Sequence, residues 1–133
     1  MSYLRYVVAV PLVFHGLANL AGLFAPWTGG AGQDFSGRPW IFSSGVTLPS
    51  PVGRAWSLLW LVSTIFLVGA GIGVIAHQQW WRALAIAGCA VSLVSIVPWW
   101  NTVPPGARFG AIFDVIVIAV LVSPLGARIA AAV

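Results

Sequence analysis

The stretch AWSLLWLVSTIFLVGAGIGVIA, residues 55–76, decides the fold, because it carries no charged side chain over its whole length. A helix needs about 20 predominantly apolar residues to cross a bilayer. Three further predominantly apolar runs cover residues 4–25, 83–99 and 109–127. Because hydrocarbon offers the backbone no partner outside its own segment, each run is expected to be a helix. The sequence therefore predicts an all-α fold, an integral membrane four-helix bundle.

The shortage of charge supports the same fold class. Of 133 residues, 6% are charged and 60% are apolar, whereas an ordinary soluble domain is about 25% charged. This composition excludes a soluble enzyme or a nucleic-acid-binding domain, since so few charges could not cover a water-facing surface. The six cations are arginines that stand singly along the chain, so the net charge of +4 forms no basic stripe for nucleic acid. We expect the lipid bilayer to be the main partner.

The connections between the runs are uneven, and we expect residues 1–133 to form a single domain. The connection over residues 26–53 is long and rich in Gly, Pro and Ser, yet it holds large side chains such as Trp27 and Trp40. We expect this long loop between the first and second helices to fold back onto the bundle or the membrane interface. The other two connections are shorter, and the last contains two consecutive prolines, which end the preceding helix.

The arginines do not settle the orientation in the membrane. Alternating helices place three on each face, with Arg5, Arg82 and Arg128 on one and Arg38, Arg54 and Arg108 on the other. Because the first helix often dominates the positive-inside rule, its early arginine favours both termini in the cytoplasm. A cleaved signal peptide over the first run is the alternative. That run is long for a signal peptide, contains polar residues and lacks a small-x-small cleavage site.

Polar side chains inside a membrane are costly and mark functional sites. His15 and Asn19 are four residues apart and share one face of the first helix. From the rise per residue, His15 lies about 15 Å and Asn19 roughly 9–10 Å below the face that carries the long loop. Asp114, six residues past Arg108, is expected about 9 Å deep. Ser92 falls in the same half, so we expect a polar pocket that opens toward the long loop.

Asp114 is the one acid within an apolar run. An unpaired carboxylate in lipid is expensive, so it must neutralise or find a cation. Arg54, at the start of the second helix, is the more attractive partner, because Arg108 has the wrong spacing on its own helix. The roles left open are a buried Asp–Arg or Asp–His pair that fixes helix register, ligand or proton handling, and snorkelling to water. For His15 they are a hydrogen bond across helices, to Asp114 or a serine, and a proton acceptor or ligand contact.

No metal or cofactor site is expected. His77 is the only other histidine and belongs to the opposite end of the bundle from His15, so the two cannot share a metal. The sequence also has no nucleophile motif and no Gly-rich phosphate loop. Cys89, the single cysteine, is expected to be an inert buried thiol. Gly69 and Gly73 form a small-xxx-small pattern, which is typical of close helix packing.

Residues 15–22, HGLANLAG, resemble the start of small four-helix bacterial membrane proteins of the DoxX-like families. Further similarity follows in the same order at LWL (59–61), FLVGAG (66–71), WWR (80–82) and ARFG (107–110). The resemblance implies a four-helix protein of the bacterial cytoplasmic (inner) membrane, in a family whose namesake is a subunit of a thiosulfate:quinone oxidoreductase. Asn19 stands where the family pattern has a second histidine, which argues against any role that requires a histidine pair.

We therefore expect a non-catalytic accessory or binding subunit. It would hold a small hydrophobic molecule, such as a quinone or lipid, or a partner's transmembrane helix, in a pocket lined by His15, Asn19, Arg54, Ser92 and Asp114. The alternative is a membrane oxidoreductase subunit with proton transfer at His15 and Asp114. A small transporter is third and needs a continuous polar path, which a homo-oligomer could supply. A purely structural scaffold is the remaining alternative.

Overall fold

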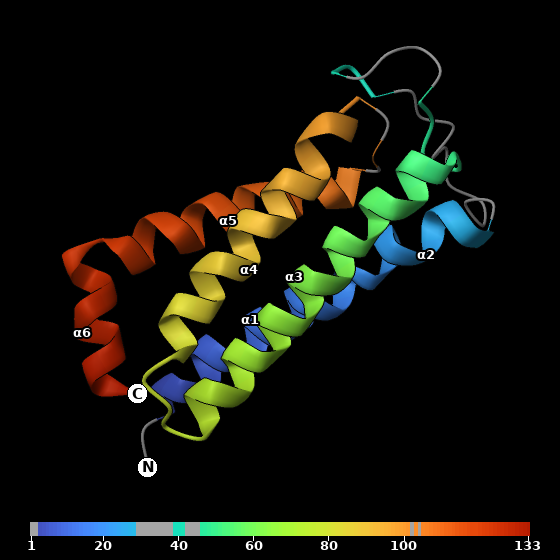
Figure 1. Ribbon diagram of the computed structural model, residues 1–133. Helices are drawn as coiled ribbons and strands as arrows, with labels where there is room; N and C mark the ends of the chain where they lie inside the picture. Colours follow the sequence, from blue (N-terminus) through green and yellow to red (C-terminus); the bar gives the residue numbers. More distant parts are fainter. Residues whose placement is uncertain (1–2, 29–38, 42–45, 102, 104) are drawn as a thin grey trace.

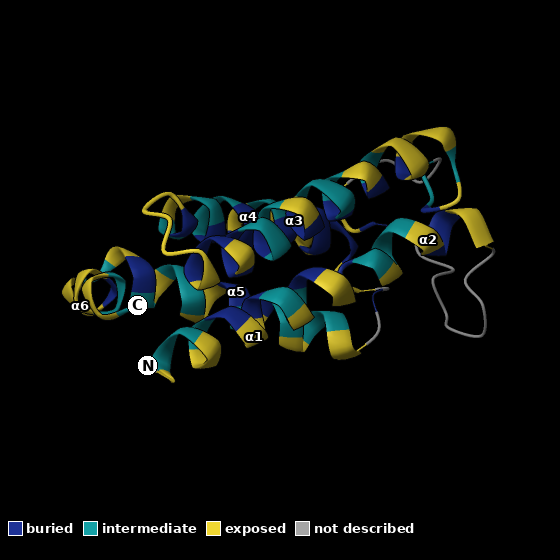
Figure 2. Cartoon of the chain, turned by 90° about the horizontal axis from the view of Figure 1, so that it is seen from below, coloured by how far each residue is buried: buried dark blue, intermediate teal, exposed yellow. Residues whose placement is uncertain are grey.

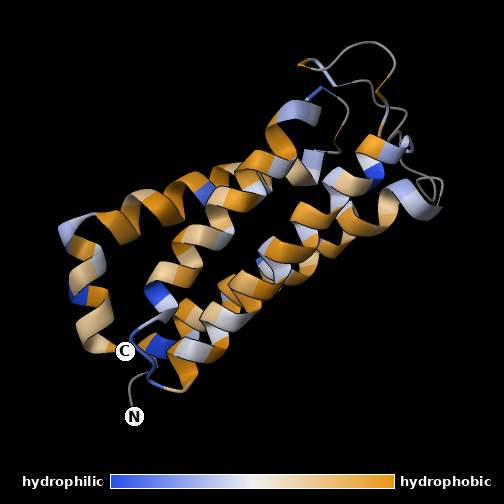
Figure 3. Cartoon of the chain, viewed as in Figure 1, coloured by the Kyte–Doolittle hydropathy of each residue, from blue (hydrophilic) through white to orange (hydrophobic). Residues whose placement is uncertain are grey.

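The computed structural model (Figure 1) is helical, with no strand among the residues it describes, which are 3–28, 39–41, 46–101, 103 and 105–133. Four helical stretches are long and apolar enough to cross a membrane, namely Leu4–Thr28, Pro51–Ile75, Trp81–Trp99 and Pro105–Val122. Figure 3 shows hydrophobic residues along most of their length. The all-α fold and the four apolar spans are therefore confirmed.

Each span corresponds to one or two helices. The first span consists of α1 (Leu4–Ala18) and α2 (Leu20–Thr28), which meet at Asn19. The second is α3 (Pro51–Ile75), and the third is α4 (Trp81–Ile96) extended by the 3-10 turn η1 (Val97–Trp99). The fourth is α5 (Pro105–Val122), which is followed by the short helix α6 (Pro124–Ala132).

The helix α3 lies between α1 and α4, and α5 packs along α4 (Figure 1). The backbones of α1 and α5 therefore share no extended interface. Glycines bring α3 close to both neighbours. A Cβ on Gly71 would lie 2.5 Å from Val13 Cγ2 of α1, and one on Gly73 would lie 2.9 Å from Trp81 Cβ of α4. The glycine-rich end of α3 is thus closely packed, as the sequence predicts.

The core consists of two apolar clusters, one toward each end of the bundle. Leu67 and Trp81 belong to the cluster at the end that carries both termini. Leu48 and Trp99 belong to the cluster at the opposite end. Figure 2 shows the buried faces of the helices turned toward one another and the exposed faces turned outward. The outward faces carry large apolar side chains, Phe109 being 71% exposed, and a surface of this kind suits lipid and not water.

Three of the helix ends that differ from the sequence prediction lie at or near a proline. The second span begins at Pro51 and not at 55, because proline fits the first turn of a helix and the Ser50 hydroxyl caps it by accepting from the Gly53 N–H. The fourth span begins at Pro105 and not at 109, since Pro105 also suits a first turn. It ends at Val122 and not at 127.

The chain turns sharply between α5 and α6. Pro124 has no N–H to continue the helix, and Ser123 is extended, with its hydroxyl accepting from the Leu125 N–H. The carbonyl of Leu121, near the end of α5, accepts hydrogen bonds from the Arg82 guanidinium. The helix α6 then runs across the end of the bundle and is seen end-on in Figure 2. The expected single helix over 109–127 was therefore wrong beyond the proline.

The connection between the first two spans is shorter at both ends than the expected loop over 26–53. Helix α2 continues through Thr28, and α3 starts at Pro51. Residues 29–38 and 42–45 lie outside the described residues, and with them most of the expected loop.

The described parts of this connection pack on the bundle. The indole Nε1 of Trp40 donates to the Val97 carbonyl at 2.6 Å, and Leu48 is fully buried. The backbone passes so close to α3 that a Cβ on Gly53 would lie 2.1 Å from the Leu48 carbonyl oxygen. These contacts fix the chain at the point where α3 begins.

Both ends of the chain lie at the same end of the bundle, beside the turn between α3 and α4 (Figure 1). His77 in this turn has a φ of 55°, and the N–H groups of His77 and Gln78 return to α3 carbonyls in the Schellman pattern. Arg5 of α1 donates to His77 Nε2 at 2.9 Å, so His77 Nδ1 carries the hydrogen that it donates to the Val133 carbonyl at 2.8 Å. His77 therefore ties together α1, α3 and the end of the chain after α6.

Candidate functional site

His15 and Asp114 make a direct contact between α1 and α5. His15 Nε2 lies 2.7 Å from Asp114 Oδ1, and the Asp114 side chain is fully buried while that of His15 is 11% exposed. The His15 ring also lies against Phe113, with the ring centroids 4.7 Å apart. This contact joins the two spans that share no extended backbone interface.

Asp114 lies deeper in its span than the sequence predicts. Helix α5 starts at Pro105, so Asp114 lies nine residues, or roughly 14 Å, along the helix axis. The sequence prediction counted from Arg108 and gave about 9 Å. The first span also continues to Thr28 and not to 25, so His15 lies 13 residues, or roughly 20 Å, from its end. Both side chains therefore lie well inside their spans.

The predicted ion pair between Asp114 and Arg54 was wrong. Arg54 lies over the Trp27 ring, with its guanidinium carbon 5.2 Å from the ring centroid. It stands in the first turn of α3, at the end of the span, where an arginine can interact with an aromatic side chain and with water. Asp114 lies well inside its span, and His15 is its partner instead. The alternative of a buried Asp–His pair is therefore confirmed.

The other oxygen of the Asp114 carboxyl group, Oδ2, is buried and accepts no hydrogen bond from the described residues. The fully buried Cys89 thiol of α4 lies beside this carboxyl group. Cys89 therefore forms part of the surroundings of Asp114 and does not merely fill the core. Nothing in the sequence signals this position, because the two residues stand on different helices.

Asn19 forms a second polar cluster, at the junction of α1 and α2. Its Nδ2 donates to Ser63 Oγ of α3 at 2.9 Å and to Ser92 Oγ of α4 at 3.4 Å. The Ser63 hydroxyl in turn donates to the Gly88 carbonyl at 2.9 Å. One amide thus links three helices, and the structure brings the predicted Asn19 and Ser92 together.

Two buried hydroxyl groups of α3, those of Ser63 and Thr64, lie at this second polar cluster and were not predicted. The Thr64 hydroxyl donates to the Gly16 carbonyl of α1 at 2.8 Å. Serine and threonine commonly form such hydrogen bonds between membrane helices. The sequence offers one sign of their role, since Ser63 and Thr64 are the only two neighbouring polar residues in the run over 55–76.

A cavity of about 260 Å³ lies beside the His15–Asp114 pair. Its polar lining comes from His15 and Asn19, and its other walls are small or apolar residues. These are Ala18, Ala21, Gly22, Trp60, Ile96, Val103, Gly106, Ala107 and Gly110. Ala18, Ala21 and Gly106 are exposed and form the rim.

The structure separates the five predicted site residues into three groups. His15 and Asn19 line the cavity, as predicted. Asp114 and Ser92 do not line it but hold the two lining side chains from behind. Arg54 stands apart, at the start of α3.

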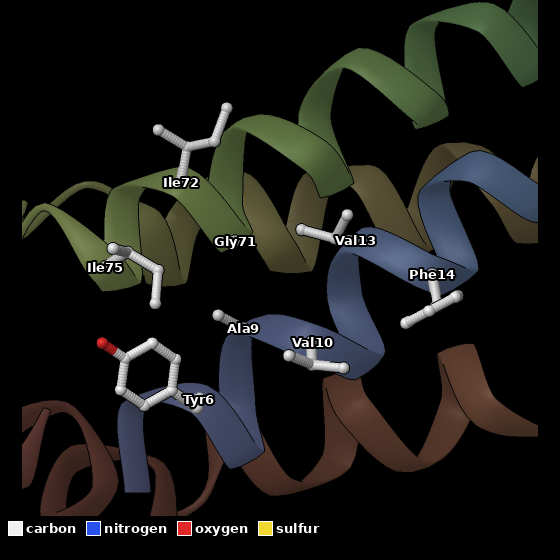
Figure 4. Close-up of a pocket in the computed structure, with 8 residues that line it drawn as sticks. All are labelled: Tyr6, Ala9, Val10, Val13, Phe14, Gly71, Ile72 and Ile75. Carbon is white, nitrogen blue, oxygen red and sulfur yellow. The ribbon is translucent and has the colours of Figure 1, made fainter. Parts of the chain in front are cut away.

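Two further grooves, both beside α1, lack such polar groups. A groove of about 370 Å³ between α1 and α3 is apolar apart from the phenol of Tyr6 and includes Val10, Phe14 and Ile72 (Figure 4). A smaller groove of about 210 Å³ lies between α1 and α5 and has only apolar side chains in its lining. Neither groove offers a polar group that is fixed by a buried partner. The cavity beside His15 is therefore the stronger candidate site.

Among the residues described, no three His, Cys, Asp or Glu side chains gather as a metal site would require. The chain matches no protein-family model, no curated protein and no solved structure. The resemblance to the DoxX-like families therefore stays a prediction that rests on residues 15–22 and the short segments that follow them.

Proposed function

We propose that this chain is an integral membrane binding subunit, non-catalytic on its own, that holds a small and largely apolar molecule in the cavity beside His15 and Asn19. One observation carries the proposal, namely two fixed polar groups in a cavity whose other walls are apolar. Binding sites for small molecules commonly combine apolar walls with a few polar groups that set the orientation of the ligand.

Both polar groups are held in place before any ligand arrives. Asp114 fixes the His15 ring at 2.7 Å, and the hydroxyls of Ser63 and Ser92 hold the Asn19 amide. Groups fixed in this way lose little freedom on binding, which lowers the cost of association. A polar layer that served helix packing alone would not need the open volume in front of it.

The volume of the cavity limits what it can hold. About 260 Å³ is slightly below the range of roughly 300–1,000 Å³ that is common for drug-sized ligands. We therefore propose a compact molecule, such as a quinone ring, or the polar end of a longer lipid. A longer apolar tail would leave the cavity at the exposed Ala18 and Ala21 and lie in the surrounding bilayer.

Binding is favoured over the oxidoreductase alternative by the lining of the cavity. Proton transfer at His15 would need a polar path to one face of the membrane. Beyond His15 and Asn19, the described lining is apolar or small. The same lining argues against a transport path through a single chain.

We also propose a bacterial cytoplasmic membrane, with both termini in the cytoplasm. The end of the bundle with the termini carries Arg5, Arg82 and Arg128, and the other end carries Arg54 and Arg108. Arg38, the sixth arginine, lies outside the described residues. Arg5 precedes the first span, which supports this orientation because early charges often dominate.

Native mass spectrometry of the chain purified from membranes tests the binding proposal. Wild type should retain a small-molecule adduct that Gly106→Phe loses. Gly106 lines the cavity, and a Cβ there would meet nothing within 4 Å, so a phenylalanine can block the mouth without displacing the backbone. Val94→Phe, on the exposed face of α4, is the matched control and should keep the adduct. A wild-type chain without an adduct, or an adduct that survives Gly106→Phe, would contradict the proposal.

A further inference from the structure

The hydrogen bond to Asp114 uses one of the two nitrogens of the His15 ring. His15 Nε2 lies 2.7 Å from Asp114 Oδ1, and among the described residues none bonds to the other ring nitrogen, Nδ1. The described arginines at this end of the bundle are engaged elsewhere, Arg54 over Trp27 at 5.2 Å and Arg108 over a second tryptophan at 5.7 Å. Nδ1 is therefore the ring atom that can serve a ligand.

Nδ1 can form a hydrogen bond in every tautomer of the ring. A neutral imidazole donates from one nitrogen and accepts at the other, and a protonated ring donates from both. Nδ1 lies beside the cavity wall at Gly110, where a Cβ would lie 3.7 Å from it.

Asn19 supplies the complementary group. Its Nδ2 is used by the two serine hydroxyls, at 2.9 and 3.4 Å. Among the described residues, none donates to its carbonyl oxygen Oδ1, which leaves this residue of the cavity lining with an acceptor for a ligand. The cavity thus combines a fixed ring nitrogen with a fixed amide.

A hydroxyl suits these two groups, because it can both accept and donate a hydrogen bond. His15 and Asn19 are four residues apart and share one helix face. A hydroxyl can therefore bond to His15 Nδ1, to Asn19 Oδ1 or to both. A charged headgroup would find no counter-ion in the described lining, which holds no arginine, lysine, aspartate or glutamate.

We infer that this cavity selects a neutral, hydroxyl-bearing amphiphile over a molecule of the same shape that lacks the hydroxyl. The inference rests on the proposed function and narrows it to one class of ligand. A membrane-soluble alcohol or phenol belongs to this class, and a carboxylate or phosphate headgroup does not.

Photolabelling of the full chain in lipid nanodiscs tests the inference. The probe is an eight-carbon alkanol that carries a diazirine, and its partner is the alkane with the same diazirine and no hydroxyl. After irradiation, peptide mass spectrometry measures labelling at the cavity. The apolar groove between α1 and α3 (Figure 4) serves as an internal reference for partitioning into the membrane. Relative to this groove, the cavity should favour the alkanol by at least about fivefold, the effect of one net hydrogen bond.

Two variants assign the preference to its residues. His15→Leu combined with Asp114→Leu removes the ring nitrogens and their buried partner together, and such replacement of a whole buried pair is often tolerated. In this double variant the cavity should still be labelled, with the preference for the alkanol much reduced. Asn19→Leu removes the acceptor alone and should also reduce the preference. Gly106→Phe should abolish labelling of the cavity by both probes.

The possible results separate the inference from the proposed function. Preferential labelling by the alkanol that falls in the double variant supports the inference. Equal labelling of the cavity by both probes overturns the inference and leaves a binding cavity. Absence of cavity labelling by either probe, or labelling that persists in Gly106→Phe, overturns both.

Discussion

His15 Nε2 and Asp114 Oδ1 lie 2.7 Å apart, although 99 positions separate the two residues in the chain. The pair connects α1 with α5, which share no extended backbone interface. It therefore closes the bundle at its middle, and it also fixes one of the two polar groups that line the cavity. Its contribution to stability and its contribution to ligand selection can be measured separately.

Removing one member of this pair should destabilise the fold more than removing both. His15→Leu leaves the fully buried Asp114 carboxyl group without its partner, and loss of one partner of a buried pair costs about 3–5 kcal/mol. The double variant with Asp114→Leu leaves no unpaired polar group and should be less than about 2 kcal/mol below wild type. Unfolding of the chain in mixed detergent and SDS micelles, followed by circular dichroism, measures both values. Equal loss in the single and double variants would show that the two side chains act independently.

Two buried serines should differ because only one connects helices. Ser63 accepts from Asn19 and donates to the Gly88 carbonyl, whereas Ser95 bonds to the Ser92 carbonyl of its own helix. Ser63→Ala should cost about 1 kcal/mol, and Ser95→Ala should cost roughly half of that or less. The same unfolding measurement compares them. A larger loss in Ser95→Ala would argue against the Asn19 cluster as a link between helices.

Two glycines that line the cavity should respond in opposite ways to alanine. A Cβ on Gly22 would lie 2.5 Å from the Trp60 ring, which is 3% exposed and has little room to move. Gly22→Ala should therefore destabilise by about 1–3 kcal/mol through overpacking. Gly106→Ala meets nothing within 4 Å and should be neutral or stabilise by up to about 1 kcal/mol, because alanine favours helix. Thermal unfolding in detergent gives both signs, and a stable Gly22→Ala would contradict the observed contact between α2 and α3.

The left-handed residue at the end of α3 provides a test outside the cavity. His77 has a φ of 55°, a conformation that favours glycine, and its ring bonds to Arg5 and to the carbonyl of Val133. His77→Ala loses these bonds and keeps the backbone strain, whereas His77→Gly loses the bonds and relieves the strain. The glycine variant should therefore be more stable than the alanine variant by about 1 kcal/mol. Melting temperatures of the two variants decide this, and the reverse order would contradict the Schellman ending of the helix.

The approximate positions of the four spans followed from residue type alone. Hydrocarbon requires about 20 apolar residues and an internally bonded backbone, so runs such as 55–76 could only be helices. The helix ends were less predictable, because proline can either begin or end a helix. Pro51 and Pro105 begin helices in this chain, whereas Pro124 separates α5 from α6. The distinction depends on which neighbouring groups satisfy the free backbone atoms, as Arg82 does for the Leu121 carbonyl.

The sequence by itself determined that this chain carries four membrane-length helices and that Asp114 needs a partner within the bundle, because lipid solvates neither charge nor unpaired backbone. Only the tertiary structure decided that the partner is His15 and not Arg54. That choice depends on the start of α5 and on the rotation of each helix about its axis. Neither can be predicted from the spacing of apolar residues, because the helix faces that contact lipid and those that contact protein are equally hydrophobic. For the same reason, only the folded chain placed Cys89 beside Asp114 and opened a cavity in front of His15 and not in front of Arg54.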